Sequence, residues 1–93
     1  MVYPFVKYSD GTEVVFSNIQ VNENGDGDET LFVHFERPME YGFDSVRIEL
    51  PSYRITYKEG HYTDEEIELF RKVVEYGAPN FYMWAREGGI KIA

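Results

Sequence analysis

Apolar and polar side chains alternate with a period of two through the first half of the chain, which predicts antiparallel β-strands. The pattern is cleanest in residues 44–50, where Val46 and Ile48 alternate with Arg47 and Glu49. Segments that read as strands in this way are residues 2–8, 13–21, 30–36 and 44–50.

Two proline-containing stretches interrupt this pattern. Residues 37–43 hold a proline and a glycine and are interpreted as a break between strands. Residues 51–58 alternate again, but with the opposite parity to residues 44–50. Pro51 and Ser52 therefore form either a bulge within one long strand or a turn into a fifth strand. We favour two strand segments and leave their connection open.

The period changes to that of a helix after residue 60. Thr63 followed by Glu66 predicts a capping box, and the apolar residues beyond it recur at helical intervals. Gly77 is the expected residue just past the helix, and Pro79 is expected to open a second helix over 79–87. The sequence therefore predicts one long and one short C-terminal helix.

Together these segments predict a single α+β domain that spans residues 1–93. Its four or five antiparallel strands form a meander, and both helices pack on one face of the sheet. A chain of 93 residues can form one modest hydrophobic core. The chain is 43% apolar and contains eight Tyr, seven Phe and one Trp, unlike the aromatic-poor composition of disordered proteins.

The chain contains no cysteine. Disulfides, thiolate metal sites and a cysteine nucleophile are therefore excluded, and a reducing compartment is favoured. The N-terminal residues lack the apolar run of a signal peptide, and no stretch approaches the ~20 consecutive apolar residues of a membrane helix. We therefore expect a soluble, cytoplasmic protein that does not bind membranes.

The net charge of −8 is unevenly distributed along the chain. Residues 1–46 hold nine acids and two bases, whereas residues 47–93 hold eight acids and seven bases. An acidic surface of this kind repels nucleic acid and attracts cationic partners. Acidity also keeps a small domain soluble, which is the simplest reason for it.

Residues 21–30, VNENGDGDET, are the most acidic part of that half and suggest a calcium loop. Asn22, Asn24 and Asp26 match the spacing of the first calcium ligands. Position one lacks Asp, however, and position twelve is Val33 where a bidentate Glu is required. We therefore predict no metal and no cofactor, and interpret the loop as a solvated turn or a partner contact.

The leading functional hypothesis is a non-enzymatic interaction module that binds the basic surface of a partner protein. One version is an inhibitor or DNA mimic, of the kind that phages and mobile elements encode, in which carboxylates replace phosphates. Direct binding of nucleic acid is not expected. The predicted partner-binding residues are Glu23, Asp26, Asp28, Glu29, Glu36, Glu40 and Asp44.

Two alternatives use other features of the chain. In the first, a small enzyme or ligand-binding domain uses the open face of the sheet, with His34, Arg47 and Arg54 as its polar groups. A ribonuclease-like set that adds Glu49 is opposed by the negative charge, and no catalytic residue is assigned. In the second, the chain forms a homodimer or larger homo-oligomer of structural role through an edge strand or its aromatic C-terminal helix.

Overall fold

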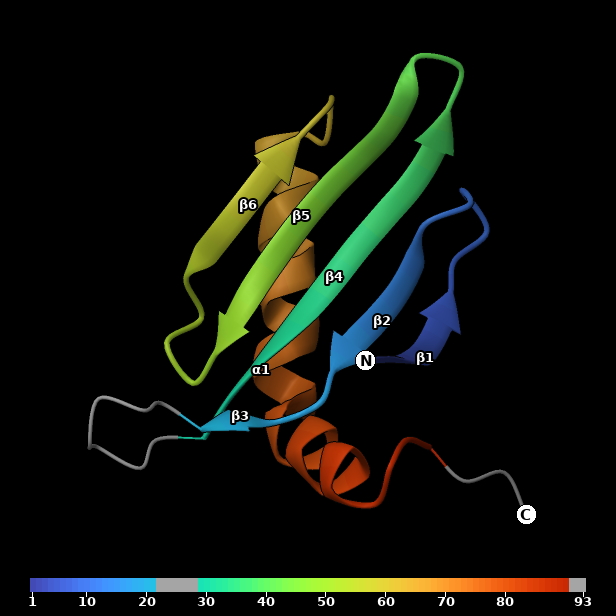
Figure 1. The fold of residues 1–93 in the computed structure, drawn as a ribbon. Coiled ribbons are helices and arrows are strands. Elements are labelled where there is room, and N and C mark those ends of the chain that lie inside the picture. Colours follow the sequence, from blue (N-terminus) through green and yellow to red (C-terminus); the bar gives the residue numbers. More distant parts are fainter. Residues whose placement is uncertain (22–28, 91–93) are drawn as a thin grey trace.

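The computed structural model describes residues 1–21 and 29–90, which form an antiparallel sheet with one helix across it (Figure 1). In chain order the elements are β1 (Val2–Lys7), β2 (Glu13–Ser17), β3 (Gln20–Val21), β4 (Glu29–Met39), β5 (Gly42–Leu50), β6 (Ile55–Glu59) and α1 (Asp64–Arg86). The strand order is β1-β2-β4-β5-β6, and the short β3 pairs with the start of β4. The predicted α+β class and the antiparallel meander are confirmed.

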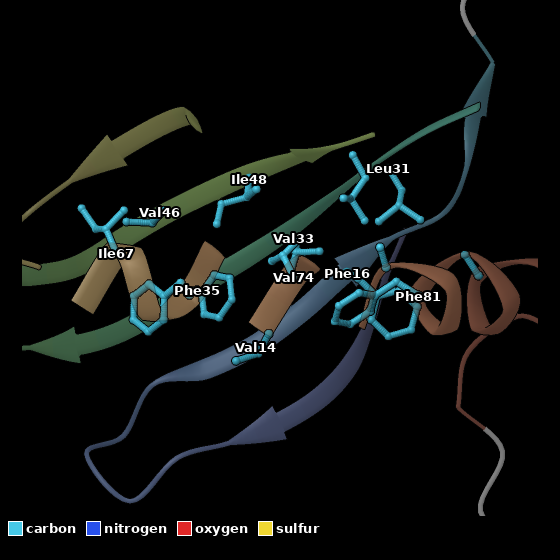
Figure 2. Packing of buried hydrophobic residues seen from close by; sticks show 14 of the residues in the cluster. Val14, Phe16, Leu31, Val33, Phe35, Val46, Ile48, Ile67, Val74 and Phe81 are labelled. Carbon is cyan, nitrogen blue, oxygen red and sulfur yellow. The ribbon is translucent and has the colours of Figure 1, made fainter. Parts of the chain in front are cut away.

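The core lies between α1 and one face of β2, β4 and β5, because alternate side chains of those strands point towards the helix (Figure 2). The strands contribute Val14, Phe16, Leu31, Val33, Phe35, Val46, Ile48 and Leu50, and the helix contributes Ile67, Phe70, Val74, Ala78, Phe81 and Ala85. The ring of Phe35 stacks on that of Phe70, with ring centroids 4.2 Å apart. The alternation in residues 30–36 and 44–50 therefore reports the buried face of β4 and β5 correctly.

The predicted second helix is not confirmed, because α1 continues through Gly77 and Pro79 to Arg86. Its N-terminus is as predicted: Thr63 and Glu66 form both hydrogen bonds of a capping box. Pro79 cannot donate the usual hydrogen bond four residues back, but the buried stripe keeps its helical spacing on both sides of it. Gly77 has a packing role instead, since a Cβ there would lie 3.0 Å from the Phe81 ring.

The predicted break at residues 37–43 is shorter than expected: only Glu40 and Tyr41 form the turn, and the residues on either side of them extend β4 and β5 into a long hairpin. β2 pairs with β4 only as far as Glu36, and β6 pairs with β5 only as far as Ser45. The hairpin therefore projects beyond its neighbours, as Figure 1 shows. Pro38 lies in this projecting part, where no further described strand needs its missing N–H.

The segment after β5 is a tight turn into a separate strand, which settles the alternative that the sequence left open. Tyr53 adopts a positive φ of 59°, and its N–H donates to the Glu49 carbonyl over 2.7 Å. The Glu49 N–H in turn donates to the Arg54 carbonyl. β6 then begins at Ile55, and its pairing with β5 shifts register between Arg47 and Ile48.

Candidate functional site: the open face of the sheet

The face of the sheet opposite α1 is not covered by any element that the structure describes (Figure 1). Residues of opposite parity to the core point to this open face. Cross-strand pairing arranges them in rows that run across the strands. The central row is Pro4, Val15, His34, Arg47 and Tyr57, and the acidic row is Lys7, Glu13, Glu36, Ser45 and Glu59.

Arg47 occupies the middle of the central row, and its guanidinium is held in place by its neighbours. Its Nε donates to the Thr56 hydroxyl over 2.8 Å. Its Cζ lies 5.1 Å from the centroid of the Phe32 ring and 5.9 Å from that of Tyr57. Arg47 is half-buried, and among residues 1–21 and 29–90 no carboxylate forms an ion pair with it.

His34 is the direct cross-strand neighbour of Arg47. Burial, and then the positive charge of Arg47, lower the pKa of the His34 imidazole below its ordinary value of 6.5. The ring is therefore neutral at pH 7, with one nitrogen that donates a hydrogen bond and one that accepts. This half-buried pair thus combines a fixed cation with a neutral imidazole.

The acidic row places two carboxylates directly opposite each other, because Glu13 pairs with Glu36 across β2 and β4. Like charges at such positions destabilise a sheet. Lys7 approaches Glu13 at 3.8 Å, but both side chains are well exposed, so this pair offsets little. At the other end of the row, the Tyr57 hydroxyl donates to Glu59. The row therefore carries a net negative charge next to the apolar and aromatic residues of the face.

The projecting end of the β4–β5 hairpin adds an apolar area to this surface. Pro38 pairs with Phe43, both on the open-face parity, and 55% of Phe43 is exposed. Met39 and Tyr41 at the same tip are also exposed, at 43% and 54%, but Met39 has the inward parity and Tyr41 donates to the inward Asp44, so neither belongs to the open face. Pro38 and Phe43 therefore extend the apolar part of the open face, and exposed apolar side chains that gather are typical of a contact surface.

Of the seven acidic residues predicted to bind a partner, the four that the structure describes do not form one surface. Glu23, Asp26 and Asp28 lie outside the described residues. Of the remainder, Glu36 lies in the acidic row, and Glu40 is exposed in the β4–β5 turn.

Glu29 and Asp44 are engaged within the fold. Glu29 begins β4, where its carboxylate accepts from Arg86 over 2.8 Å. It lies at the end of β4 opposite to Glu40, roughly 35 Å away at the usual rise of a strand. Asp44 is completely buried, and its carboxylate is already occupied by donors within the protein. It therefore cannot belong to an exposed acidic surface, which corrects that part of the prediction.

Asp44 instead forms a buried ion cluster with Arg37. The Asp44 carboxylate accepts from Arg37 Nη2 at 2.7 Å and Nε at 3.0 Å, from the Tyr41 hydroxyl, and from the His61 N–H at 2.8 Å. Burial acts to raise the pKa of Asp44, but hydrogen bonds from Tyr41, the His61 N–H and Arg37 outweigh it and lower the pKa to about 2. The cluster therefore keeps a charged carboxylate inside the fold.

Other segments join the cluster through Arg37. Its Nη1 donates to Asp10 in the β1–β2 turn at 3.0 Å and to Glu66 in α1 at 3.3 Å. Its Cζ lies 4.6 Å from the centroid of the Tyr62 ring. A signal for this cluster is present in the sequence, since Arg37 and Asp44 continue the inward parity of β4 and β5. A charge of each sign at inward positions predicts an ion pair.

The alternative open-face site is assembled in part. His34 and Arg47 are brought together, but Arg54 lies in the turn before β6. Its guanidinium is 3.6 Å from Glu49, and 72% of its side chain is exposed. Glu49 also accepts from the Ser52 hydroxyl over 2.6 Å. The side chains of Arg54 and Glu49 therefore interact with each other and with the turn before β6. The pair that the fold presents is therefore His34 and Arg47.

Within residues 1–21 and 29–90, no three or more His, Asp or Glu side chains are grouped so that they could hold a metal ion. In the same part of the chain, no helix is long and apolar enough to cross a membrane. A search of family models, of curated proteins and of solved structures found no match to this chain.

Proposed function

We propose that the protein is a non-enzymatic interaction module that binds a basic partner protein through the open face of its sheet. The observation that carries the proposal is the acidic row, which lies between two apolar parts of an uncovered face. Apolar side chains supply contact area, and the carboxylates select a cationic partner and steer its approach.

The mixed character of this face favours a protein surface over the DNA-mimic version of the hypothesis. A mimic presents carboxylates where DNA has phosphates, but here a cation and two aromatic rings lie beside the carboxylates: Arg47, Phe32 and Tyr57. Aromatic residues and Arg are enriched in protein–protein interfaces. The proposed partner therefore offers both basic and apolar side chains to this face.

An enzymatic use of the same face is supported less well. General acid–base catalysis needs two groups that converge on one substrate. Glu36, two residues from His34 on the same face of β4, is roughly 7 Å away along the strand. The pairing of His34 with Arg47 is better suited to binding a ligand than to catalysis.

Photo-crosslinking in the cells that produce the protein tests which face binds. A benzophenone amino acid replaces Tyr57 on the open face or, as the matched control, Tyr76 on α1, which is 93% exposed. We expect an adduct with another protein from position 57 and none from position 76. The adduct should disappear in Glu36→Lys and persist in Glu68→Lys, a charge reversal at an exposed position of α1.

Three other crosslinking outcomes would count against the proposal. Equal adducts from both positions, or an adduct unaffected by Glu36→Lys, would show that the acidic row does not select the partner. An adduct of twice the mass of the chain would indicate a homodimer instead. Circular dichroism of Glu36→Lys serves as the folding control, and we expect its melting temperature to match or exceed the wild-type value because the substitution removes a like-charge pair.

A further inference from the structure

We infer that Arg47 is the anchor of a carboxylate-binding subsite within the open face, and that the partner contributes the carboxylate. The inference deepens the proposed function, because it uses the same face and names a chemical group that the partner must carry.

The guanidinium of Arg47 is oriented before any ligand binds. One of its five N–H groups, on Nε, is committed to Thr56, and the rings of Phe32 and Tyr57 lie on either side of it. Within the described residues, no acceptor binds the N–H groups of Nη1 and Nη2. A fixed fork of donors is thus available, and little side-chain entropy is lost when it binds a ligand.

The nearby acids do not neutralise Arg47, although one of them is close on the same strand. Glu49 lies two residues further along β5, but its carboxylate accepts from Ser52 and pairs with Arg54. By contrast, Arg37 and Arg86 each form an ion pair at 3.0 Å or less. Arg47 is therefore a half-buried cation whose natural counter-ion is not supplied by residues 1–21 and 29–90.

The surroundings favour a carboxylate over a phosphate. A planar carboxylate matches the guanidinium fork with two parallel hydrogen bonds. A phosphate brings up to two negative charges next to Glu36 and Glu13 on a protein of net charge −8, which opposes its binding. The neutral ring of His34 lies beside Arg47 and can donate one further N–H to a carboxylate oxygen.

The distance between the rows defines the partner segment further. Arg47 lies one row from Glu36, and successive rows on one face are about 7 Å apart along the strands. Alternate residues of an extended peptide have the same spacing. A segment in which an acid and a base are separated by one residue can therefore place its carboxylate on Arg47 and its base on Glu36.

Titration with synthetic peptides, followed by NMR of the ¹⁵N-labelled protein, tests this subsite. The acidic peptide is acetyl-Val-Glu-Val-Lys-Val-amide, and the matched control peptide has Gln in place of Glu. We expect the acidic peptide to bind about tenfold more tightly and to shift the Nη–H resonances of Arg47, because it adds a charge-assisted bidentate contact to those groups. Arg47→Lys should remove most of that tenfold difference, because Lys cannot form the fork, whereas Arg86→Lys should leave it unchanged.

A second arm compares sodium acetate with inorganic phosphate at constant ionic strength. Saturable shifts at Arg47 with acetate, and weaker ones with phosphate, support the subsite. Equal affinity for the two peptides, or stronger binding of phosphate, would overturn it. If the control peptide binds the open face and the Glu adds nothing, the subsite fails while the proposed function stands. If acetate binds Arg47 but crosslinking from the open face fails, the subsite stands and the proposed function fails.

Discussion

Replacing Asp44 with Asn tests the buried ion cluster, because it removes the charge and keeps the size of the side chain. The carboxylate accepts from Arg37 twice, from Tyr41 and from the His61 N–H. An amide has only one oxygen, so its NH2 group must face donors on one side. Breaking a buried ion pair costs about 3–5 kcal/mol. Arg37 keeps Asp10 and Glu66 as partners, so we expect the lower end, about 3 kcal/mol.

The same charge makes stability depend on pH in a defined direction. The pKa of Asp44 in the folded protein is about 2, below the ordinary value of 3.8. Its stabilisation is therefore complete above pH 4 and is lost as the pH falls from about 4 towards 2. The difference between the two pKa values is worth about 2 kcal/mol at neutral pH. Wild type and Asp44→Asn should thus become closer in stability over that interval.

Urea unfolding measures both effects, followed by Trp84 fluorescence and far-UV circular dichroism between pH 7 and pH 2.5. A loss of about 3 kcal/mol at pH 7 lowers the melting temperature of a domain of this size by about 12–24 °C. Glu40→Gln is the matched control, since Glu40 is an exposed carboxylate of the same hairpin and should change stability by less than about 0.5 kcal/mol. The reasoning is refuted if Asp44→Asn equals this control, or if its deficit is the same at pH 2.5 as at pH 7.

Two further substitutions test how the chain is held around this cluster. Gly60→Ala should destabilise the protein by about 3 kcal/mol in urea unfolding, because its Cβ would lie 2.3 Å from the Asp44 carboxylate at a φ of +89°. Gly11→Ala is its matched control, with a φ of +93° and no atom within 4 Å, and should cost only about 1 kcal/mol; equal losses would contradict the steric argument. Thr63→Ala should cost about 1 kcal/mol in the same assay, because it removes the hydrogen bond that the Glu66 N–H donates; an unchanged unfolding midpoint would contradict this role.

The fold could be predicted from the sequence wherever one face of an element is buried and the other is not. β4 and β5 pack against α1 on one side only, so their alternation identifies the buried face, whereas β2 has apolar residues on both faces. The prediction failed at Pro38 and Pro79, where local rules place a break. Pro79 lies in a helix whose buried stripe continues on both sides of it. Pro38 lies in the part of β4 that pairs with β5 alone, so no described strand needs its missing N–H. In both places tertiary context decides what the local sequence leaves open.

The candidate site depends on pairing register, which net charge and composition do not contain. His34 lies opposite Arg47 because the β4–β5 hairpin closes with Glu40 and Tyr41 between the paired residues Met39 and Gly42. With that turn recognised, every pair along the two strands would follow, since register is fixed by the turn. The sequence interpretation treated the same residues as an irregular break, and so it could only place both side chains on one face.

The β4–β5 hairpin joins the structural and the proposed functional parts of the molecule. Its inward parity carries the Arg37–Asp44 pair, which fixes the hairpin against α1 and the β1–β2 turn. Its outward parity carries Arg47 and, from the acidic row, Glu36 and Ser45, so the cluster also holds that face in a single arrangement. A surface that is ordered before binding loses less entropy when a partner docks. The opposed carboxylates of Glu13 and Glu36 destabilise the free sheet, and a base placed between them by a partner would remove that cost. The free energy that this repulsion costs the free protein would then contribute to the affinity for a cationic group that binds between Glu13 and Glu36.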